Sequence, residues 1–351
     1  MQKQFSVGNK KIGEGHPCFI VAEMSGNHKQ DIKRAYRLID AAAAARVDAI
    51  KLQTYTPDTL TIDHNSKWFR IGKTSTWSGQ TLHKLYKTAY TPWDWHPNLF
   101  AYAHKKGLII FSSPFDTTAV DLLERLNIPV YKIASFENVD LELLRYIGKT
   151  KKPVIISRGL ASIAETSLAI TTLRAAGTPH IVVLHCVSSY PAQLEQMNVA
   201  TVADIKKRFN IITGLSDHSL GLTASVTAVA LGAKVIEKHL TLSRKEGGPD
   251  SAFSLEPKEF KELVEAIREV EIAIGKPTYK PDKREAENIV FKRSLFAVKE
   301  VKKGEKFTKE NVRSIRPGYG LTPAYLPQVL GKIARVTVER GTPLTWKLIR
   351  K

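Results

Sequence analysis

IITGLSDH (residues 211–218) and KVIEKH (residues 234–239) are short apolar runs that each end on a histidine, and an earlier run, FIVAE (residues 19–23), ends on Glu23. Such runs, short and bounded by turn residues, are typical of buried parallel strands. If repeated β–α units close into one barrel, the first, seventh and eighth strands become neighbours. Glu23, His218 and His239 would then meet at one mouth of that barrel.

The same alternation extends over most of the chain. Eight apolar runs predict strands, at 18–22, 48–54, 108–113, 129–134, 153–157, 180–186, 211–216 and 234–239. Helical spacing of apolar residues follows each strand in turn, at 31–46, 94–106, 117–126, 140–148, 161–176, 199–208, 220–231 and 257–274. An unbroken series of eight such units favours a closed (β/α)8 barrel of the α/β class over an open sheet.

Two segments depart from this repeat. Residues 55–92 form a long, aromatic-rich connection after the second strand, on the side where barrel enzymes build their sites. After Gly275 a stretch rich in proline and charge precedes short β runs. We therefore predict a barrel domain over 1–276, a linker over 277–290 and a small β-rich domain over 291–351. So small a domain is expected to dock, either on its own barrel or on a partner's.

The net charge is +19, from 53 basic and 34 acidic residues. Because the basic residues are spread over amphipathic helices, we interpret most of them as solvated faces, with some steering of an anionic substrate. A nucleic-acid-binding protein is the alternative that charge alone would allow, but no nucleic-acid motif accompanies it. The two cysteines, the lack of an apolar leader and the lack of a span of ~20 apolar residues predict a cytoplasmic protein with no membrane partner.

Lysines inside apolar strands are the next informative feature. Lys51 and Lys132 lie on predicted strands two apart, and a buried ammonium group is costly unless it meets an opposite charge or a ligand. Together with nearby serine hydroxyls they predict a site for a phosphate or a carboxylate. Two alternatives stay open. The lysines could form salt bridges with Glu23 or Glu137, or Lys132 could be a Schiff-base nucleophile.

The two histidines beside a carboxylate predict a metal site. Imidazole nitrogens with few other protein ligands suit Mn²⁺, Zn²⁺ or similar ions, and an incomplete ligand set is typical of a catalytic metal. The alternative for any one histidine is a helix cap or a polar position in the core.

Eight segments resemble the sialic acid synthase family in order. They are FIVAEMSGNHKQDIKRA, DAIKLQTYTPDTLT, YTPWDWH, FSSPFD, YKIASFEN, GLSDHSLG, EKHLTLSRKEGGPDSAFSLEP and IRPGYGL. The resemblance covers nearly the whole chain, and the C-terminal module resembles the family's antifreeze-like (SAF) domain. It implies a transferase that condenses phosphoenolpyruvate with an acetamido sugar. Three of the variants, QTYTPDT, YTPWDWH and GGPDSAFSLEP, resemble the pseudaminic acid synthase branch, with the N-acetylneuraminate and legionaminic acid synthases as alternatives.

The resemblance also implies roles for individual residues. His218 and His239 match ligands for a divalent metal, Mn²⁺ or Mg²⁺, and Glu23 matches a catalytic position beside it. Positions that bind phosphoenolpyruvate are matched by Lys51, Ser113, Lys132, Ser135, Ser157 and Ser216. Positions near the sugar are matched by Glu137, Tyr190 and Asp250, and Gln53 is predicted to bind substrate as well. Arg316 matches an arginine supplied by the partner subunit, which implies a domain-swapped homodimer.

The chain departs from the family pattern at three places. Arg158 follows Ser157 where the family usually has threonine, and we expect it to affect phosphate binding. Ser113 replaces a threonine and keeps the hydroxyl. Ser188 and Ser189 stand where the neuraminate branch commonly has a sugar-contacting amide, which disfavours N-acetylneuraminate as the product.

Overall fold

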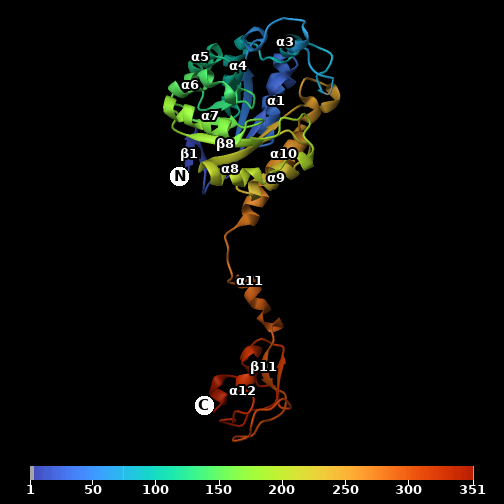
Figure 1. Cartoon of the computed structure of the whole chain (residues 1–351). Helices are drawn as coiled ribbons and strands as arrows, with labels where there is room; N and C mark the ends of the chain where they lie inside the picture. Colours follow the sequence, from blue (N-terminus) through green and yellow to red (C-terminus); the bar gives the residue numbers. More distant parts are fainter. Residues whose placement is uncertain (1–3, 74, 351) are drawn as a thin grey trace. The chain divides into compact units, whose positions relative to one another are not determined.

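The computed structural model describes residues 4–73 and 75–350, which fall into two compact units that divide after Gly275 (Figure 1). In the first unit, eight parallel strands close into a barrel in the order β10-β3-β4-β5-β6-β7-β8-β9. The strands are β3 (Phe19–Glu23), β4 (Ala49–Thr54), β5 (Ile109–Pro114), β6 (Tyr131–Ile133), β7 (Val154–Ser157), β8 (Ile181–Cys186), β9 (Ile212–Asp217) and β10 (Val235–His239). The predicted (β/α)8 barrel is confirmed.

A helix follows each barrel strand and packs on the outside of the barrel (Figure 1). Several of these helices begin at capping residues. At the start of α7, for example, Ser162 and Glu165 form a capping box, and Gly177 ends that helix with a φ of 114°. The eight are α1 (Ile32–Ala44), α4 (His96–Lys105), α5 (Thr117–Arg125), α6 (Leu141–Lys149), α7 (Ile163–Ala176), α8 (Thr201–Phe209), α9 (Thr223–Ala230) and α10 (Pro257–Ile274).

Strand register places key residues side by side. Glu23 pairs with His239 on one neighbouring strand and with Lys51 on the other. Ser216 pairs with Glu237 across β9 and β10. Because alternate residues of a strand point to the same side, Glu237 and His239 both face the interior of the barrel. The closing seam between the first and last strands therefore presents charged groups at the C-terminal mouth.

A short antiparallel hairpin precedes the barrel and was not predicted. Strand β1 (Gln4–Val7) pairs with β2 (Lys10–Gly13) and buries Phe5, Val7 and Ile12. The ring of Phe5 stacks on His180, which immediately precedes β8, at a centroid distance of 5.1 Å. The hairpin thus covers the N-terminal end of the barrel, opposite the mouth with the charged residues.

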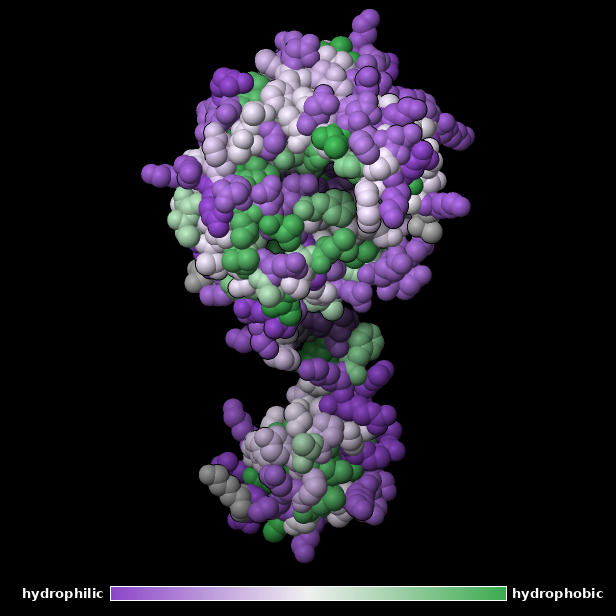
Figure 2. Space-filling view, turned by 45° about the horizontal axis from the view of Figure 1, so that its top comes forward, coloured by the Kyte–Doolittle hydropathy of each residue, from purple (hydrophilic) through white to green (hydrophobic). Residues whose placement is uncertain are grey.

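The long connection after β4 contains helix α2 (Pro57–Leu60), helix α3 (Leu82–Ala89) and two 3-10 turns, η2 (Lys67–Phe69) and η3 (Trp93–Trp95). It lies at the C-terminal mouth, as predicted from its place after a strand. Figure 2 is turned toward this end and shows a hollow bordered by apolar side chains. Further 3-10 turns in the loops of this unit are η1 (Ser25–His28), η4 (Glu137–Val139), η5 (Leu194–Gln196), η6 (Arg244–Glu246) and η7 (Ser251–Phe253).

The second unit has its own small core. Strand β11 (Ser294–Ala297) pairs with β12 (Val312–Ile315), and isolated bridges extend the β structure. Its buried core is made of Leu295, Ala297, Val301, Phe307, Val312, Val329, Ala334, Val338, Leu344 and Ile349. The remaining elements are α11 (Lys283–Ala286), η8 (Glu287–Phe291), η9 (Pro323–Tyr325), α12 (Leu326–Val329) and η10 (Trp346–Leu348).

Across the described residues of both units, every helix is too short or too polar to cross a bilayer.

Candidate active site

A cavity of about 510 Å³ opens at the C-terminal mouth of the barrel. Strand ends form its floor, while the β4–α4 connection and the loop after β10 form its sides. It is lined by every predicted site residue of the barrel unit except Glu23 and Ser113; these are Lys51, Gln53, Lys132, Ser135, Glu137, Ser157, Tyr190, Ser216, His218, His239 and Asp250. The predicted site residues therefore gather around one cavity, whereas their individual roles stay predictions.

Two lysines and two carboxylates lie at the floor or directly behind it. Lys51 forms an ion pair with Glu23, and its Nζ lies 3.6 Å from Oε1 of Glu237. Lys132 Nζ lies 3.6 Å from the same oxygen. All four side chains are buried. The alternative that Lys51 is paired with Glu23 is confirmed, and both lysines also converge on a second carboxylate that the sequence analysis did not single out.

Serine hydroxyls extend this charged floor. Lys51 Nζ donates to Ser113 Oγ at 3.2 Å, and Lys132 Nζ donates to Ser157 Oγ at 2.8 Å. Ser216 Oγ donates to Glu237 at 3.2 Å, and Ser188 Oγ donates to Ser135 Oγ at 3.1 Å. Ammonium and hydroxyl donors around one small volume are the groups that bind a phosphate or a carboxylate.

Burial governs the charges of this floor. It raises the pKa of Glu23 to about 7, although Lys51 opposes that shift. It also lowers the pKa of Lys132. For Lys51, burial works in the same direction but Glu23 outweighs it, so the pKa of Lys51 is raised. An arriving anion would stabilise both ammonium groups in a place where water is largely excluded.

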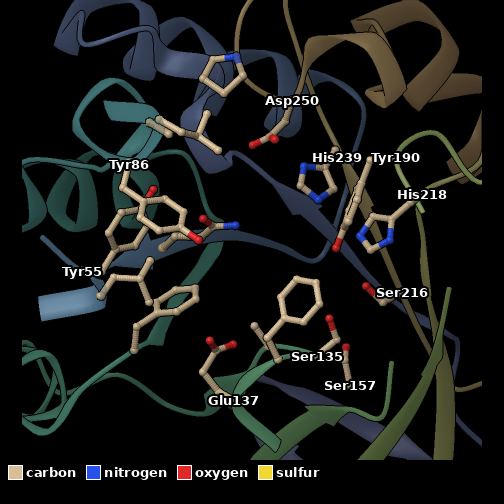
Figure 3. A pocket seen from close by; sticks show the side chains of 18 of the residues that line it. Tyr55, Tyr86, Ser135, Glu137, Ser157, Tyr190, Ser216, His218, His239 and Asp250 are labelled. Atoms are coloured by element: carbon tan, nitrogen blue, oxygen red, sulfur yellow. The ribbon is translucent and has the colours of Figure 1, made fainter. Parts of the chain in front are cut away.

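His218 and His239 face one another above the floor, with ring centroids 5.3 Å apart (Figure 3). His218 Nδ1 donates to the carbonyl oxygen of Val187 at 2.9 Å, which leaves Nε2 as the nitrogen that can bind a ligand. Burial opposes the cationic form of His218, but the neighbouring Cys186 thiol raises the pKa of this imidazole. Burial and the other imidazole hold the pKa of His239 well below its usual value.

The donor set fits a divalent cation only in part. Nδ1 of His239 is buried and has no hydrogen-bond partner among the described residues, and together with His218 Nε2 it supplies nitrogen donors. The expected three-residue cluster is wrong, however. Within residues 4–73 and 75–350, no group of three or more His, Cys, Asp or Glu side chains is arranged to hold a metal. The reason is that the Glu23 carboxylate is taken by Lys51 and by the backbone N–H of Ser25.

The residues matched to the sugar line the upper part of the cavity. Burial raises the pKa of Glu137 to about 7, and its Oε2 is buried without a hydrogen-bond partner in the described structure. Burial also raises the pKa of Asp250, against the effect of Ser25 and Gly26. The ring of Tyr190 packs on His218 at a centroid distance of 4.6 Å. Figure 3 shows Glu137 and Asp250 on opposite walls, both directed into the cavity.

Two arginines were also singled out from the sequence. Arg158 donates to the carbonyl oxygen of Ala161 at 3.0 Å and does not line the cavity, so the expectation that it affects phosphate binding stays a prediction without a contact to support it. Its side chain is held by its own loop. Arg316 belongs to the second unit, where its guanidinium carbon lies 5.9 Å from the centroid of the Phe291 ring.

Sequence analysis missed two groups of lining residues. Glu237 could have been found, since it lies two positions before His239 on a strand and so faces the same side. The second group is an apolar wall made by Tyr55, Leu60, Ile71, Trp77, Leu82, Leu85, Tyr86, Ala89 and Phe253. The sequence feature that could have revealed this wall is the spacing of Leu82, Leu85, Tyr86 and Ala89, which places all four on one face of a helix.

The chain is similar to known proteins over almost its full length. The NeuB family model matches residues 38–279, and the SAF domain model matches residues 292–350. A pseudaminic acid synthase of Campylobacter jejuni is 44% identical over 93% of this chain and 95% of its own length. A pseudaminic acid synthase of Helicobacter pylori is 41% identical over 94% of this chain and 97% of its own. A solved N-acetylneuraminic acid synthetase of Leptospira borgpetersenii is 33% identical, with a TM-score of 0.72 over 82% of this chain and 96% of its own.

These matches agree with the geometry of the barrel unit. The family model covers the strands that carry Lys51, Lys132, His218 and His239, and the second model covers the module with the antiparallel pair β11–β12. The resemblance found in the sequence is confirmed. The chain belongs to the NeuB family and carries a C-terminal SAF domain.

Proposed function

We propose that the chain is a pseudaminic acid synthase. It joins phosphoenolpyruvate to the open-chain aldehyde of a 2,4-diacetamido-2,4,6-trideoxy hexose of the altrose type, and releases phosphate. The observation that carries the proposal is the single cavity in which Lys51, Lys132 and serine hydroxyls lie below the facing His218 and His239. The two pseudaminic acid synthases that are 44% and 41% identical support the choice of product.

The floor binds phosphoenolpyruvate. Lys51, Lys132, Ser113, Ser135, Ser157 and Ser216 supply the ammonium and hydroxyl donors for its phosphate and carboxylate groups. Glu23 and Glu237 keep the lysines in place before the substrate arrives, because each buried ammonium group otherwise has no opposite charge nearby. Bound in this way, the enol carbon C3 is directed toward the histidine pair.

The histidine pair is the proposed metal position. His218 and His239 would hold a divalent cation, Mn²⁺ or Mg²⁺, which when bound polarises the sugar aldehyde. Val187 fixes the orientation of His218 by accepting its Nδ1 proton.

The condensation consumes one water molecule for each phosphate that is released. C3 of phosphoenolpyruvate attacks the aldehyde carbon, whose oxygen takes up a proton to become a hydroxyl. Water adds to C2 and gives up a proton, and the tetrahedral intermediate then loses phosphate by cleavage of the C–O bond, which leaves a ketone at C2. Glu23 is the group proposed to take the proton from that water, since its pKa of about 7 lets it accept a proton near neutrality. Lys132 and Ser157 hold the phosphate as it leaves.

A phosphate-release assay over three acceptors tests this proposal. The diacetamido altrose, N-acetylmannosamine and arabinose 5-phosphate would each be supplied with phosphoenolpyruvate, with and without a chelator. We expect release with the diacetamido sugar at a rate well above the other two, and loss of that rate after chelation. Faster release with N-acetylmannosamine would move the chain to the N-acetylneuraminate branch, and full turnover in chelator would contradict the proposed metal.

The Schiff-base alternative deserves a direct test, because burial lowers the pKa of Lys132. Lys132 Nζ nevertheless donates to Ser157 and lies near Glu237, contacts that favour an ammonium group used for binding. Pyruvate or phosphoenolpyruvate with cyanoborohydride should leave the mass of the protein unchanged. A stable adduct at Lys132 would replace the condensation proposed above with an imine mechanism.

A domain-swapped homodimer is part of the proposal, with Arg316 supplied by the partner subunit. Chains carrying Arg316→Ala and chains carrying His239→Ala should each be inactive. Mixed after unfolding and refolding together, they should recover about a quarter of the wild-type sites, since one site of each hybrid dimer then holds both residues. Inactive mixtures would show that the arginine acts within its own chain.

A cytoplasmic location, with neither nucleic acid nor membrane as a partner, completes the proposal. Both Cys18 and Cys186 are free and buried, as expected in a reducing compartment.

A further inference from the structure

One face of helix α3 lines the cavity instead of packing on the barrel. Leu82, Leu85, Tyr86 and Ala89 recur at spacings of three, one and three residues, and all four border the cavity. Leu85 is buried, whereas Leu82 and Tyr86 are half-buried. An apolar helix face that remains partly open to a cavity is stabilised when an apolar group covers it. We call these four residues the α3 wall.

Neighbouring side chains extend the apolar surface around the α3 wall. Leu60, Ile71 and Tyr55 border the same part of the cavity. The Tyr55 ring packs edge-on against Tyr86 at 5.7 Å and against Phe115 at 5.1 Å. Burial raises the pKa of both tyrosines, so their hydroxyls stay neutral. This end of the cavity therefore offers hydrocarbon and aromatic surface, on which the two neutral phenol groups are the polar atoms.

Contacts at both of its sides hold the α3 wall in place. A Cβ at Gly26 would lie 3.1 Å from the backbone of Ala89, so the end of α3 packs directly on the loop after β3. His28 Nε2 hydrogen-bonds Thr91 Oγ1 at 3.1 Å. On the other side, Trp77 Nε1 donates to the carbonyl oxygen of Pro249 at 2.6 Å and ties the connection to the loop after β10. The surface is preformed, which limits the entropy lost when a ligand binds.

The direction of the acceptor follows from the two ends of the cavity. Figure 3 shows Tyr55 and Tyr86 across the cavity from Ser157, Ser216 and His218. The aldehyde carbon of the acceptor must lie at the polar end, where phosphoenolpyruvate and the histidine pair are. The opposite end of the six-carbon chain, C6, then points toward the α3 wall.

We infer that the α3 wall determines acceptor specificity by receiving the C6 methyl group, together with the methyl of the nearer acetamido group. The inference rests on the proposed function and adds to it a physical reason for preferring a 6-deoxy sugar. A 6-hydroxymethyl sugar would have to bury a hydroxyl against leucine and aromatic carbon, where the phenol groups of Tyr55 and Tyr86 are the polar groups of this surface. Discrimination of this kind in an apolar pocket is typically about 10- to 200-fold.

Two acceptors that differ only at C6 provide the test. They are the 2,4-diacetamido-2,4,6-trideoxy altrose and its 6-hydroxy counterpart, and the readout is the ratio of their kcat/KM values. The wild-type ratio should exceed roughly 10 in favour of the 6-deoxy sugar. Leu82→Asn keeps the side-chain size while adding an amide, so the ratio should fall about tenfold with an unchanged KM for phosphoenolpyruvate.

Matched variants keep the result interpretable. Leu168→Asn makes the same change at an exposed leucine on α7 and should leave the ratio at its wild-type value. Tyr86→Phe keeps the ring and should also keep the preference. If Leu82→Asn fails to fold by circular dichroism, Ile71→Asn, on a half-buried loop residue, replaces it.

The outcomes distinguish a failure of the α3 wall inference from a failure of the proposed function. A wild-type enzyme that turns over both sugars equally, or an unchanged ratio in the wall variant, overturns the role of the α3 wall while leaving the synthase proposal standing. A wild-type chain that releases no phosphate with either sugar overturns the proposed function and, with it, this inference.

Discussion

Glu237 Oε1 lies 3.6 Å from Lys132 Nζ at the floor of the cavity. The same oxygen is equally far from Lys51 Nζ and accepts the Ser216 hydroxyl proton. With Glu23 also paired to Lys51, two buried ammonium groups face two buried carboxylates. The floor is thus close to neutral before any substrate binds.

Replacing Glu237 by glutamine should destabilise the free protein and increase its response to anions. Removing one partner of a buried ion pair typically costs about 3–5 kcal/mol because a charge is left without compensation. Thermal melts should show a lower Tm without ligand and a larger increase on adding phosphate than in wild type. Glu142→Gln breaks an exposed pair with Arg145 and should change stability by less than about 1 kcal/mol. Equal phosphate responses in wild type and Glu237→Gln would contradict this view of the floor.

Replacing His239 by alanine should abolish phosphate release and leave the barrel folded. The imidazole makes no hydrogen bond at Nδ1 within the described chain, so little stability depends on it. Removing a group that only hydrogen-bonds a metal ligand lowers metal affinity about 10- to 100-fold. Removing a ligand itself should lower the affinity for Mn²⁺ by at least as much. Titration calorimetry with Mn²⁺ measures this, with His104→Ala, at an exposed position on α4, as the control. Unchanged Mn²⁺ affinity in His239→Ala would place the cation elsewhere.

The buried Glu137 should make stability depend on pH. Its pKa is raised by burial from 4.5 to about 7, so folding favours the protonated form. That stability is fully present below pH 4.5 and is lost as the pH rises through 7, by at most about 3 kcal/mol. Glu137→Gln should therefore be more stable than wild type at pH 8.5 and similar to it at pH 4.5, as measured by urea unfolding. An equal gain in the free energy of unfolding at both pH values would show that the charge of Glu137 is not the cause.

Gly214 should tolerate no side chain. A Cβ there would lie 2.2 Å from the carbonyl oxygen of Val235 on the adjacent strand β10, and backbone atoms cannot move aside easily. Gly214→Ala should lower stability by about 1–3 kcal/mol and disturb Ser216, on the same strand, and His218, which follows the end of that strand. Gly72→Ala is the control, since its Cβ would meet no atom within 4 Å. A Tm equal to that of the control would contradict the close approach of β9 and β10.

The periodicity of the sequence was sufficient for the barrel but not for its details. Each strand was a continuous apolar run, so the eight strands and the meeting of His218 with His239 could be predicted from their order. The β1–β2 hairpin was missed because its two strands, QFSV and KKIG, mix polar with apolar residues and so form no continuous apolar run. Glu23 lies beside His239, as predicted, but it does not complete a three-residue ligand group, because the sequence alone does not show that Lys51, on the other neighbouring strand, competes for the same carboxylate.

The location of Gly26 beneath Ala89 has a consequence for how this enzyme can change. The residues proposed to carry out the reaction lie at the ends of the barrel strands. The α3 wall, which is proposed to face the acceptor, belongs instead to one continuous insertion that packs on the backbone of Gly26. Exchanging residues 55–92 between relatives, while keeping Gly26 so that the end of α3 can pack against it, should therefore change which sugar the synthase accepts.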